Sequence, residues 1–471
     1  MDRSFNNWLK SLVIPNINKN SRRGERIRLR LEHLESRINP SFATAALFTA
    51  GDSPISVASA DLNGDGKLDL VTANFNGTNV SVLLGNGDGT FQSKQDFTTG
   101  DSPAFVAIAD LNGDGKLDLA TANYGFNVNS VSILLGNGNG TFQGQQTFGT
   151  GKGPRSVAIA DLNGDGKLDL ATANFGYNAN SVSVLLGNGN GTFQPKQDFG
   201  TGSQPFSVAI ADLNGDGKLD LVTASDRSSN LSVLLGNGNG TFKTKQDFNI
   251  GSLPRSVAIA DLNGDGKLDL VTANNGDNNV GVLLGNGNGT FQANQNFGTG
   301  SYSLHVASAD LNGDGKLDLV TAGDDSSENN TVSVLLGNGN GTFKTKTDFI
   351  TGIGPKSVAI ADLNGDGKLD LVTANYLDNT VSVLLGNGNG TFKTKTDFDT
   401  GFNPDYISIA DVNGDGKLDL VTANYYFEDL SVSVLLGNGN GTFQRNQNFP
   451  TGNAPKSVAI ADLNGDGKLD L

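Results

Sequence analysis

The sequence predicts an all-β protein built from a repeated unit of about fifty residues. Three observations support this prediction. The string Asp-[Leu/Val]-Asn-Gly-Asp-Gly-Lys-Leu-Asp-Leu occurs nine times at intervals of 49 to 52 residues, with Gly-Asn-Gly-[Asn/Asp]-Gly-Thr-Phe between consecutive copies. Within each unit, runs such as Ser-Val-Ser-Val alternate polar and apolar side chains as strands do. Glycine supplies 64 of the 471 residues, roughly twice its average usage, as many tight turns would require.

Each unit contains four predicted strands. In the third unit they cover residues 142–148, which are polar with a phenylalanine at each end, then 157–160, 168–174 and 182–186. The small, uncharged strand 157–160 suits the crowded innermost position of a sheet, and the polar strand suits an exposed edge. Four strands in about fifty residues, repeated, are typical of a blade of a β-propeller. A solenoid is the competing interpretation, although its repeats are usually shorter.

Composition and charge exclude several classes of protein. The chain has no cysteine and only two histidines, which excludes disulfides and zinc–thiolate sites and leaves little for a histidine-based catalytic centre. No apolar run is long enough for a predicted transmembrane segment. Residues 1–41 carry a net charge of +5, so the other 430 carry −21. This acidic body argues against nucleic acid as a partner, because phosphate contacts need positive charge.

The acidic string has the donor pattern of a calcium loop. In residues 161–169, positions 1, 3 and 5 offer short oxygen-bearing side chains, and the glycines at positions 4 and 6 allow the backbone to coil around an ion. Position 7 can offer its carbonyl, and the aspartate at position 9 closes the ring. An EF-hand places its last ligand at position 12 between helices. Here position 12 is Thr172, inside a predicted strand.

The nine loops give a set of candidate Ca²⁺ ligands, about one ion per loop, in which each lysine contributes its carbonyl. The candidates are Asp61, Asn63, Asp65, Lys67, Asp69, Asp110, Asn112, Asp114, Lys116, Asp118, Asp161, Asn163, Asp165, Lys167, Asp169, Asp212, Asn214, Asp216, Lys218, Asp220, Asp261, Asn263, Asp265, Lys267, Asp269, Asp310, Asn312, Asp314, Lys316, Asp318, Asp362, Asn364, Asp366, Lys368, Asp370, Asp411, Asn413, Asp415, Lys417, Asp419, Asp462, Asn464, Asp466, Lys468 and Asp470. The alternative is that Asp, Asn and Gly are simply good turn residues here.

The Asp-x-Asn-x-Asp-Gly-x-x-Asp loop between strands, in units of this length, resembles the FG-GAP (VCBS-like) repeats of the integrin α-subunit propeller. The resemblance covers residues 42–471 and implies a calcium loop between the first and second strands of each blade. Asp-Phe-Gly-Thr-Gly survives in some units, whereas Ala-Pro survives only at Ala454-Pro455. Such propellers commonly have seven blades. This chain has eight units and a ninth that stops at Leu471, so seven or eight blades are expected, eight by unit count.

The loops at the opposite ends of the strands vary between units and carry aromatic residues. Exposed aromatics beside polar groups suit stacking on sugars or docking of a protein. The predicted contacts of a glycan or protein ligand are Tyr124, Phe126, Phe175, Tyr177, Tyr376, Tyr425, Tyr426 and Phe427. The alternative is that these aromatics cap the hydrophobic ends of the blades.

Residues 1–41 form a separate basic leader. Ile27, Leu31, Leu34 and Ile38 lie on one helical stripe, and the apolar run before them is too short for a convincing secretory signal. Trp8-Leu9-Lys10 and residues 31–40 are similar to the leader of large, repeat-bearing surface proteins of certain bacteria, which implies export. A disordered basic tail is the alternative.

The sequence therefore predicts an extracellular or cell-surface propeller in which calcium is structural and the opposite face binds a glycan or protein. It shows no unique catalytic constellation. A polysaccharide-degrading hydrolase or lyase is the second hypothesis, for which Asp405, Glu428 and Asp429 are the acids to consider outside the repeated loops. A spacer without a ligand is the third.

Overall fold

The computed structural model divides into two units, Met1–Phe42 and Ala43–Leu471. The residues that the structure describes all belong to the second unit. They are 51–86, 91–125, 128–254, 257–300, 303–323, 330–425, 430–450, 458 and 460. The predicted basic leader and the ninth acidic loop lie outside the described residues.

The described residues form 32 strands in eight four-stranded sheets. The first strands of the sheets are β1 (Pro54–Ala60), β5 (Pro103–Ala109), β9 (Pro154–Ala160), β13 (Pro205–Ala211), β17 (Ala258–Ala260), β21 (Ser303–Ala309), β25 (Pro355–Ala361) and β29 (Pro404–Ala410). The second strands are β2 (Asp69–Asn74), β6 (Asp118–Asn123), β10 (Asp169–Asn174), β14 (Asp220–Ser225), β18 (Asp269–Asn274), β22 (Asp318–Gly323), β26 (Asp370–Asn375) and β30 (Asp419–Tyr425). The third strands are β3 (Asn79–Leu83), β7 (Ser130–Leu134), β11 (Ser181–Leu185), β15 (Asn230–Leu234), β19 (Asn279–Leu283), β23 (Thr331–Leu335), β27 (Thr380–Leu384) and β31 (Leu430–Leu435). The fourth strands are β4 (Gln95–Thr98), β8 (Gln146–Gly149), β12 (Gln197–Gly200), β16 (Gln246–Asn249), β20 (Gln295–Gly298), β24 (Thr347–Ile350), β28 (Thr396–Asp399) and β32 (Gln447–Pro450).

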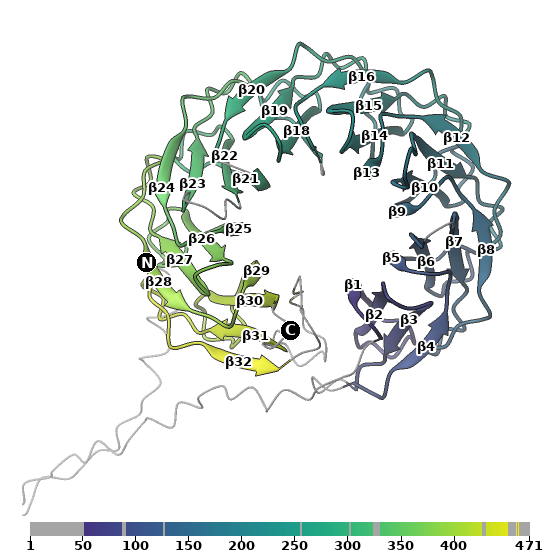
Figure 1. The fold of residues 1–471 in the computed structure, drawn as a ribbon, viewed down its shortest axis with the longest axis horizontal. Helices are drawn as coiled ribbons and strands as arrows, with labels where there is room; N and C mark the ends of the chain where they lie inside the picture. Colours follow the sequence, from purple (N-terminus) through teal and green to yellow (C-terminus); the bar gives the residue numbers. More distant parts are fainter. Residues whose placement is uncertain are drawn as a thin grey trace, which may run out of the picture. The chain divides into compact units, whose positions relative to one another are not determined.

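Each sheet is an antiparallel meander in chain order, which we call blades 1 to 8 (Figure 1). The first strand of each blade lies on the inner side and the fourth on the outer side, as predicted for the uncharged and the polar strands. In blade 1, Ala60 is opposite Asp69 and Leu70 is opposite Leu83. The all-β propeller fold predicted from the repeat is confirmed.

The polar strand predicted at the start of the third unit begins too early and belongs to a different sheet from the rest of that unit. Residues 142–148 were assigned to the third unit, but β8 covers Gln146–Gly149 and pairs with β7 of blade 2. Phe142 forms only an isolated bridge with Gly136. A unit counted from this phenylalanine therefore spans two blades.

The hydrophobic core consists of layers between consecutive blades. The layer between blades 1 and 2 joins Val71 and Val80 of one sheet to Leu119 and Leu134 of the next, all at most 1% exposed. Phenylalanine pairs close the outer end of each layer with edge-to-face rings, such as Phe97 with Phe142 at 5.1 Å between centroids. Because each blade buries its neighbour's apolar face, the blades depend on one another for stability.

A buried polar network crosses each blade beside this core. In blade 3 the Asn174 amide donates to the hydroxyls of Ser181 and Ser183, and the Ser183 hydroxyl donates to Asp198 in the outer strand. The Ser183 hydroxyl also accepts a hydrogen bond from the Gly151 N–H, in the loop that connects blades 2 and 3. The buried polar side chains of this blade 3 network are therefore hydrogen-bonded, as a low-dielectric interior requires.

Blade 5 replaces part of this network with apolar packing. Gly281 takes the place of the serine, and Ile250, which is fully buried, replaces the threonine found in the preceding loop of other units. A Cβ on Gly281 would lie 2.5 Å from Ile250 Cγ1. The larger residue thus occupies the space that the missing serine side chain leaves, and the Asn274 amide donates to the Ile250 carbonyl instead.

Candidate functional site

Each of the eight acidic loops that the structure describes is coiled by hydrogen bonds from its own backbone to its own side chains. Asp61 accepts the N–H groups of Gly64 at 2.7 Å and Gly66 at 2.9 Å. Asn63 accepts from Asp65 at 2.9 Å, and Asp65 in turn accepts from Lys67 at 3.0 Å. Gly64 and Gly66 have φ values of 73° and 82°, which side chains disfavour. The predicted need for glycine at positions 4 and 6 is thus met.

The aspartate at position 9 is buried and joins the loop to the rest of its blade. Asp69 is fully buried. One carboxylate oxygen accepts from the Leu62 N–H at 2.9 Å, at the start of the loop. The other accepts from the Gly85 N–H at 2.7 Å, after the third strand. This carboxylate therefore has a structural role that does not depend on a metal.

The pKa of the buried aspartate depends on its burial and on the other acidic residues of its loop. Burial raises the pKa of Asp69, and the Asp65 and Asp61 carboxylates raise it further, while the Gly85 and Leu62 N–H groups oppose the shift. The same causes raise the pKa of the corresponding Asp419 to about 6. Each loop thus concentrates negative charge that a cation would neutralise.

The loop lysines do not simply point into solvent. The Lys167 ammonium lies 3.3 Å from Asp165 Oδ2, and similar pairs occur in all eight loops that the structure describes. The aliphatic part of Lys116 lies against Gly138 of the Gly-Asn-Gly turn, where an added Cβ would be 2.8 Å from Lys116 Cδ. The lysine side chain is therefore part of the contact between the acidic loop and this turn.

The oxygen donors of each loop are of the chemical type that calcium prefers, but in the loops that the structure describes their side chains are not arranged around a common point. Two aspartates, an asparagine, a backbone carbonyl and a third aspartate offer the hard oxygen ligands that Ca²⁺ prefers. Within the described residues, however, no group of three or more His, Cys, Asp or Glu side chains is placed to hold a metal ion. The predicted ligands of a loop are neighbours whose carboxylates bind backbone N–H groups.

The opposite ends of the strands form a second face, which we call the variable face. It consists of the loops between the second and third strands and the loops between blades. A backbone hydrogen bond recurs there, between the residue after the second strand and the residue just before the first strand of the same blade. The N–H groups of Phe75, Tyr124 and Phe175 donate at 2.9 Å to the carbonyls of Ser53, Ser102 and Gly153. Asp226 occupies this position in blade 4, so the bond does not depend on the side chain.

Aromatic side chains of blades 1 to 4 contact one another on the variable face. The rings of Phe75 and Tyr124 are 6.0 Å apart, those of Tyr124 and Phe175 6.1 Å, and those of Phe175 and Phe206 5.2 Å. The Arg155 guanidinium lies over three of these rings, closest to Phe206 at 4.2 Å. Tyr124 and Phe175 are half-buried, so each of these predicted contact residues is partly covered by its neighbours.

Among the predicted contact residues of blades 7 and 8, the structure describes Tyr376 and Tyr425. The Lys356 ammonium lies 3.5 Å from the centroid of the Tyr376 ring and 3.1 Å from Asp405. Tyr425 is half-buried at the end of β30. The structure therefore does not bring all the predicted aromatics together. Predicted residues outside the described part of the chain are Phe126, Tyr426 and Phe427, together with Glu428 and Asp429.

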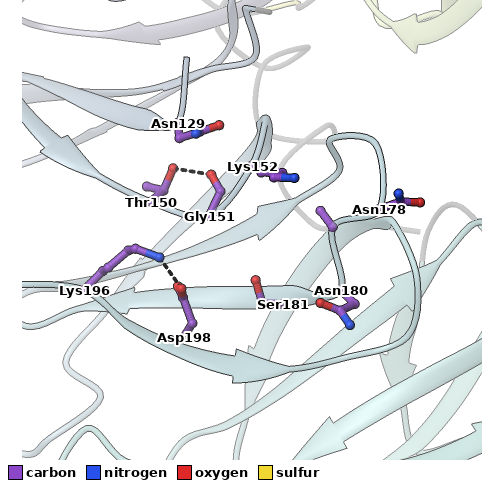
Figure 2. A pocket seen from close by; sticks show the side chains of 10 residues that line it. Asn129, Thr150, Gly151, Lys152, Asn178, Asn180, Ser181, Lys196 and Asp198 are labelled. Atoms are coloured by element: carbon purple, nitrogen blue, oxygen red, sulfur yellow. Dashed lines mark hydrogen bonds and ion pairs between the residues drawn. The ribbon is translucent and has the colours of Figure 1, made fainter. Parts of the chain in front are cut away.

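A polar pocket of about 320 Å³ lies between blades 2 and 3 at the variable face. Its lining includes Asn129, Lys152, Asn178, Asn180, Lys196 and Asp198. Figure 2 shows Asn129 and Lys152 on one side of the pocket and Asn180, Ser181 and Asp198 on the other. The Lys196 ammonium is paired with Asp198. Tyr177, the predicted contact residue that precedes Asn178, is 83% exposed.

The sequence alone did not identify this pocket, but two signals point to it. The loop between the second and third strands has six residues in blades 2 and 3, against four in blades 1 and 4. Lys152 is the only basic residue at its position in the nine repeats, where Asp, Ser, Ile, Phe or Asn otherwise stand.

The chain belongs to the FG-GAP-like repeat family. The family model matches residues 61–121, 110–172, 164–223, 212–272, 261–321, 310–373, 362–422 and 411–471. A comparison with curated proteins finds no match. The predicted membership of this repeat family is thus confirmed.

Several solved structures are similar to the chain at low sequence identity. The dihydro-heme d1 dehydrogenase NirN is 13% identical, with a TM-score of 0.51, over 86% of this chain and 76% of its own. The biofilm matrix protein Bap1 of V. cholerae is 17% identical, with a TM-score of 0.42, over 90% and 84%. An Agrocybe aegerita lectin that recognises non-reducing terminal N-acetylglucosamine is 20% identical, with a TM-score of 0.39, over 84% and 94%.

The structure also bears on membrane insertion. None of the described segments forms a helix with the length and apolar character needed to cross a bilayer.

Proposed function

We propose that this chain is an exported binding module, in which calcium in the acidic loops is structural and the variable face holds a glycan. The observation that carries the proposal is the polar pocket between blades 2 and 3, whose lining residue Asn178 follows the exposed Tyr177 in the sequence. Amide, hydroxyl and carboxylate groups can bind sugar hydroxyls, since amides and hydroxyls both donate and accept. An exposed aromatic ring can stack on the apolar face of a sugar.

The calcium part of the proposal rests on the chemistry of the loops. Each loop supplies four oxygen-bearing side chains and a carbonyl over nine residues. In the eight loops that the structure describes, the glycines already hold the left-handed backbone that the coil needs. Bound Ca²⁺ would offset the repulsion that contributes to the raised pKa of Asp69. The ion would therefore stabilise the ends of the first and second strands.

Export is proposed from the leader and from the metal. The leader is similar to those of surface-exposed repeat proteins. Extracellular calcium modules can use weak sites, with Kd values of roughly 10⁻⁴–10⁻³ M. An extracellular or cell-surface location would supply enough calcium for such sites. Detection of the native protein in the medium or on intact cells checks the location.

A glycan array probed with the calcium-loaded chain tests the binding function. We expect binding to a restricted set of glycans that weakens when Tyr177 is replaced by alanine. An array without any bound glycan, together with binding to a purified surface protein, would assign the face to a protein partner. A polysaccharide degradation screen tests the hydrolase or lyase alternative, and release of products would favour that alternative.

A further inference from the structure

We propose that the pocket between blades 2 and 3 binds a saccharide that carries a carboxylate, such as a uronic acid, with Lys152 as the residue that selects the charge. This inference rests on the proposed function and names the class of glycan. The pocket carries a net charge of +1, from two lysines and one aspartate, in a chain whose net charge is −16.

The two lysines of the pocket have different roles. The Lys196 ammonium is paired with Asp198, whose other oxygen accepts the Ser183 hydroxyl at 2.6 Å. This pair belongs to the polar network of blade 3, and the same Lys-x-Asp sequence recurs in the outer strands of other blades. Lys152 is exposed and makes no ion pair with a described residue. Its ammonium can therefore meet an anionic group without breaking an existing pair.

The backbone holds the polar rim of the pocket in place. Asn129 accepts the Thr150 N–H with its carbonyl and the Gly153 N–H with its side chain, at 2.8 and 3.3 Å. On the other side, the Asn180 carbonyl accepts the Thr201 N–H at 2.8 Å. Asn178 adopts a φ of 59°, which asparagine tolerates better than most residues. A rim fixed in this way loses little conformational entropy on binding.

The next junction along the chain lacks this combination. The loop between the second and third strands of blade 4 is two residues shorter than that of blade 3, and Ser203 stands where Lys152 stands. There the ammonium of Lys245, the counterpart of Lys196, donates to the Thr201 carbonyl of the preceding blade at 3.0 Å. The lysine of the Lys-x-Asp sequence thus bridges blades 3 and 4 as Lys245, whereas the equivalent Lys196 lines the pocket between blades 2 and 3.

The size and lining of the pocket fit a sugar rather than an apolar ligand. A volume of about 320 Å³ lies at the lower end of the range for small-molecule sites, roughly 300–1,000 Å³. Most such sites are apolar, whereas this one is lined mainly by amides, hydroxyls and charged groups. A carboxylate on Lys152 and sugar hydroxyls on the asparagines would use the polar groups of this lining.

Calorimetric titration of the calcium-loaded full chain with tetragalacturonate and tetramannuronate, each beside its neutral methyl ester, tests the inference. We expect at least one acid to bind and its ester to bind at least tenfold more weakly. Lys152→Ala should reduce affinity for the acid at least tenfold and leave affinity for the ester unchanged. Lys245→Ala removes the same charge at the next junction and should change neither. Added salt should weaken binding of the acid more than that of the ester.

Each other outcome overturns the inference in a distinguishable way. Equal binding of acid and ester, unaffected by Lys152→Ala, would contradict the charge selection and leave the glycan-binding function standing. Binding of the acid that survives both Lys152→Ala and Asn178→Ala would place the site elsewhere. Failure of all four saccharides to bind would reject uronates, and the glycan array would then decide whether the proposed function fails as well.

Discussion

The acidic-loop face and the variable face hold their loops in different ways. On the first, side chains accept the backbone hydrogen bonds, as when Asp61 accepts from Gly64 and Gly66. On the second, the recurrent bond joins two backbones, as between the Phe175 N–H and the Gly153 carbonyl. A side chain that accepts a structural bond cannot be exchanged freely, whereas one attached to a backbone–backbone bond can.

This difference explains the sequence of each face. The acidic string repeats nine times with one Leu-to-Val exchange at its second position. The position after the second strand instead carries Phe75, Tyr124, Phe175, Asp226 or Tyr376 on the same backbone bond. The invariant face is therefore suited to stability and the variable face to recognition.

Removing the buried aspartate of one acidic loop should have the largest effect among these variants. Asp220→Ala leaves the N–H groups of Leu213 and Gly236 without their carboxylate, which should lower the free energy of unfolding by about 3 kcal/mol. Asp216→Ala removes an exposed carboxylate of the same loop and should cost under about 1 kcal/mol in chelator. Urea denaturation in chelator measures both. Equal losses would contradict the distinct role of position 9.

Blade 5 offers a test of how residue changes within the buried polar network compensate each other. Gly281→Ser should place a side chain against Ile250 and destabilise the chain by roughly 1–3 kcal/mol, as overpacking does. Adding Ile250→Thr restores the combination found in other blades and should recover most of the loss. The coupling between the two changes is measured by a double-mutant cycle. Simple additivity would mean that the two residues do not compensate each other.

The buried carboxylates predict a pH dependence for the calcium-free protein. An aspartate with a pKa near 3.9 when unfolded and about 6 in the folded chain, as for Asp419, binds more protons in the folded state between these values. The stability that it contributes is therefore complete below about pH 4 and is lost as pH rises through about 6. Thermal melts in chelator across this window measure it. Stability that rises over the same window in wild type but not in Asp419→Asn would contradict the shift.

A change on the variable face should have the smallest effect on stability. Tyr177 is 83% exposed, so Tyr177→Ala should alter the free energy of unfolding by less than about 0.5 kcal/mol. Glycan binding should nevertheless weaken. Leu377→Ala, at a 42% exposed position on the variable face of blade 7, is the matched control and should leave both properties unchanged. Loss of stability without loss of binding in the tyrosine variant would assign Tyr177 to packing.

The repeat made the fold predictable from sequence, because its period and alternating strands recur in every unit. The predicted strand 168–174 nearly coincides with β10, Asp169–Asn174. The outer strand was less accurate because Phe142 and Phe148 look alike in sequence, although only Phe148 lies in the ladder, opposite Val131. The pocket could not be derived from one unit, since it forms where loops of two adjacent blades meet.

The candidate metal site was predictable in its residues but not in its geometry. The spacing identifies Asp161, Asn163, Asp165 and Asp169 as one set of oxygen donors. The spacing does not predict that Asp161 accepts the N–H of Gly164 within the loop, or that Asp169 accepts the N–H of Gly187 after the third strand. It also does not predict the ion pair between Lys167 and Asp165, because this contact depends on how the loop coils.

The most direct test of a structural role for calcium on the acidic-loop face is a thermal melt of the full chain in calcium and in excess chelator. Ligand that binds only the folded state adds about 2.7 kcal/mol per site at a hundred times its Kd, so several loops together should raise the melting temperature strongly. Magnesium should have a smaller effect, because it prefers a rigid octahedral site. A melt that is the same in calcium and chelator would show that the acidic loops are turns alone and would contradict the proposed division between a metal-stabilised face and a binding face.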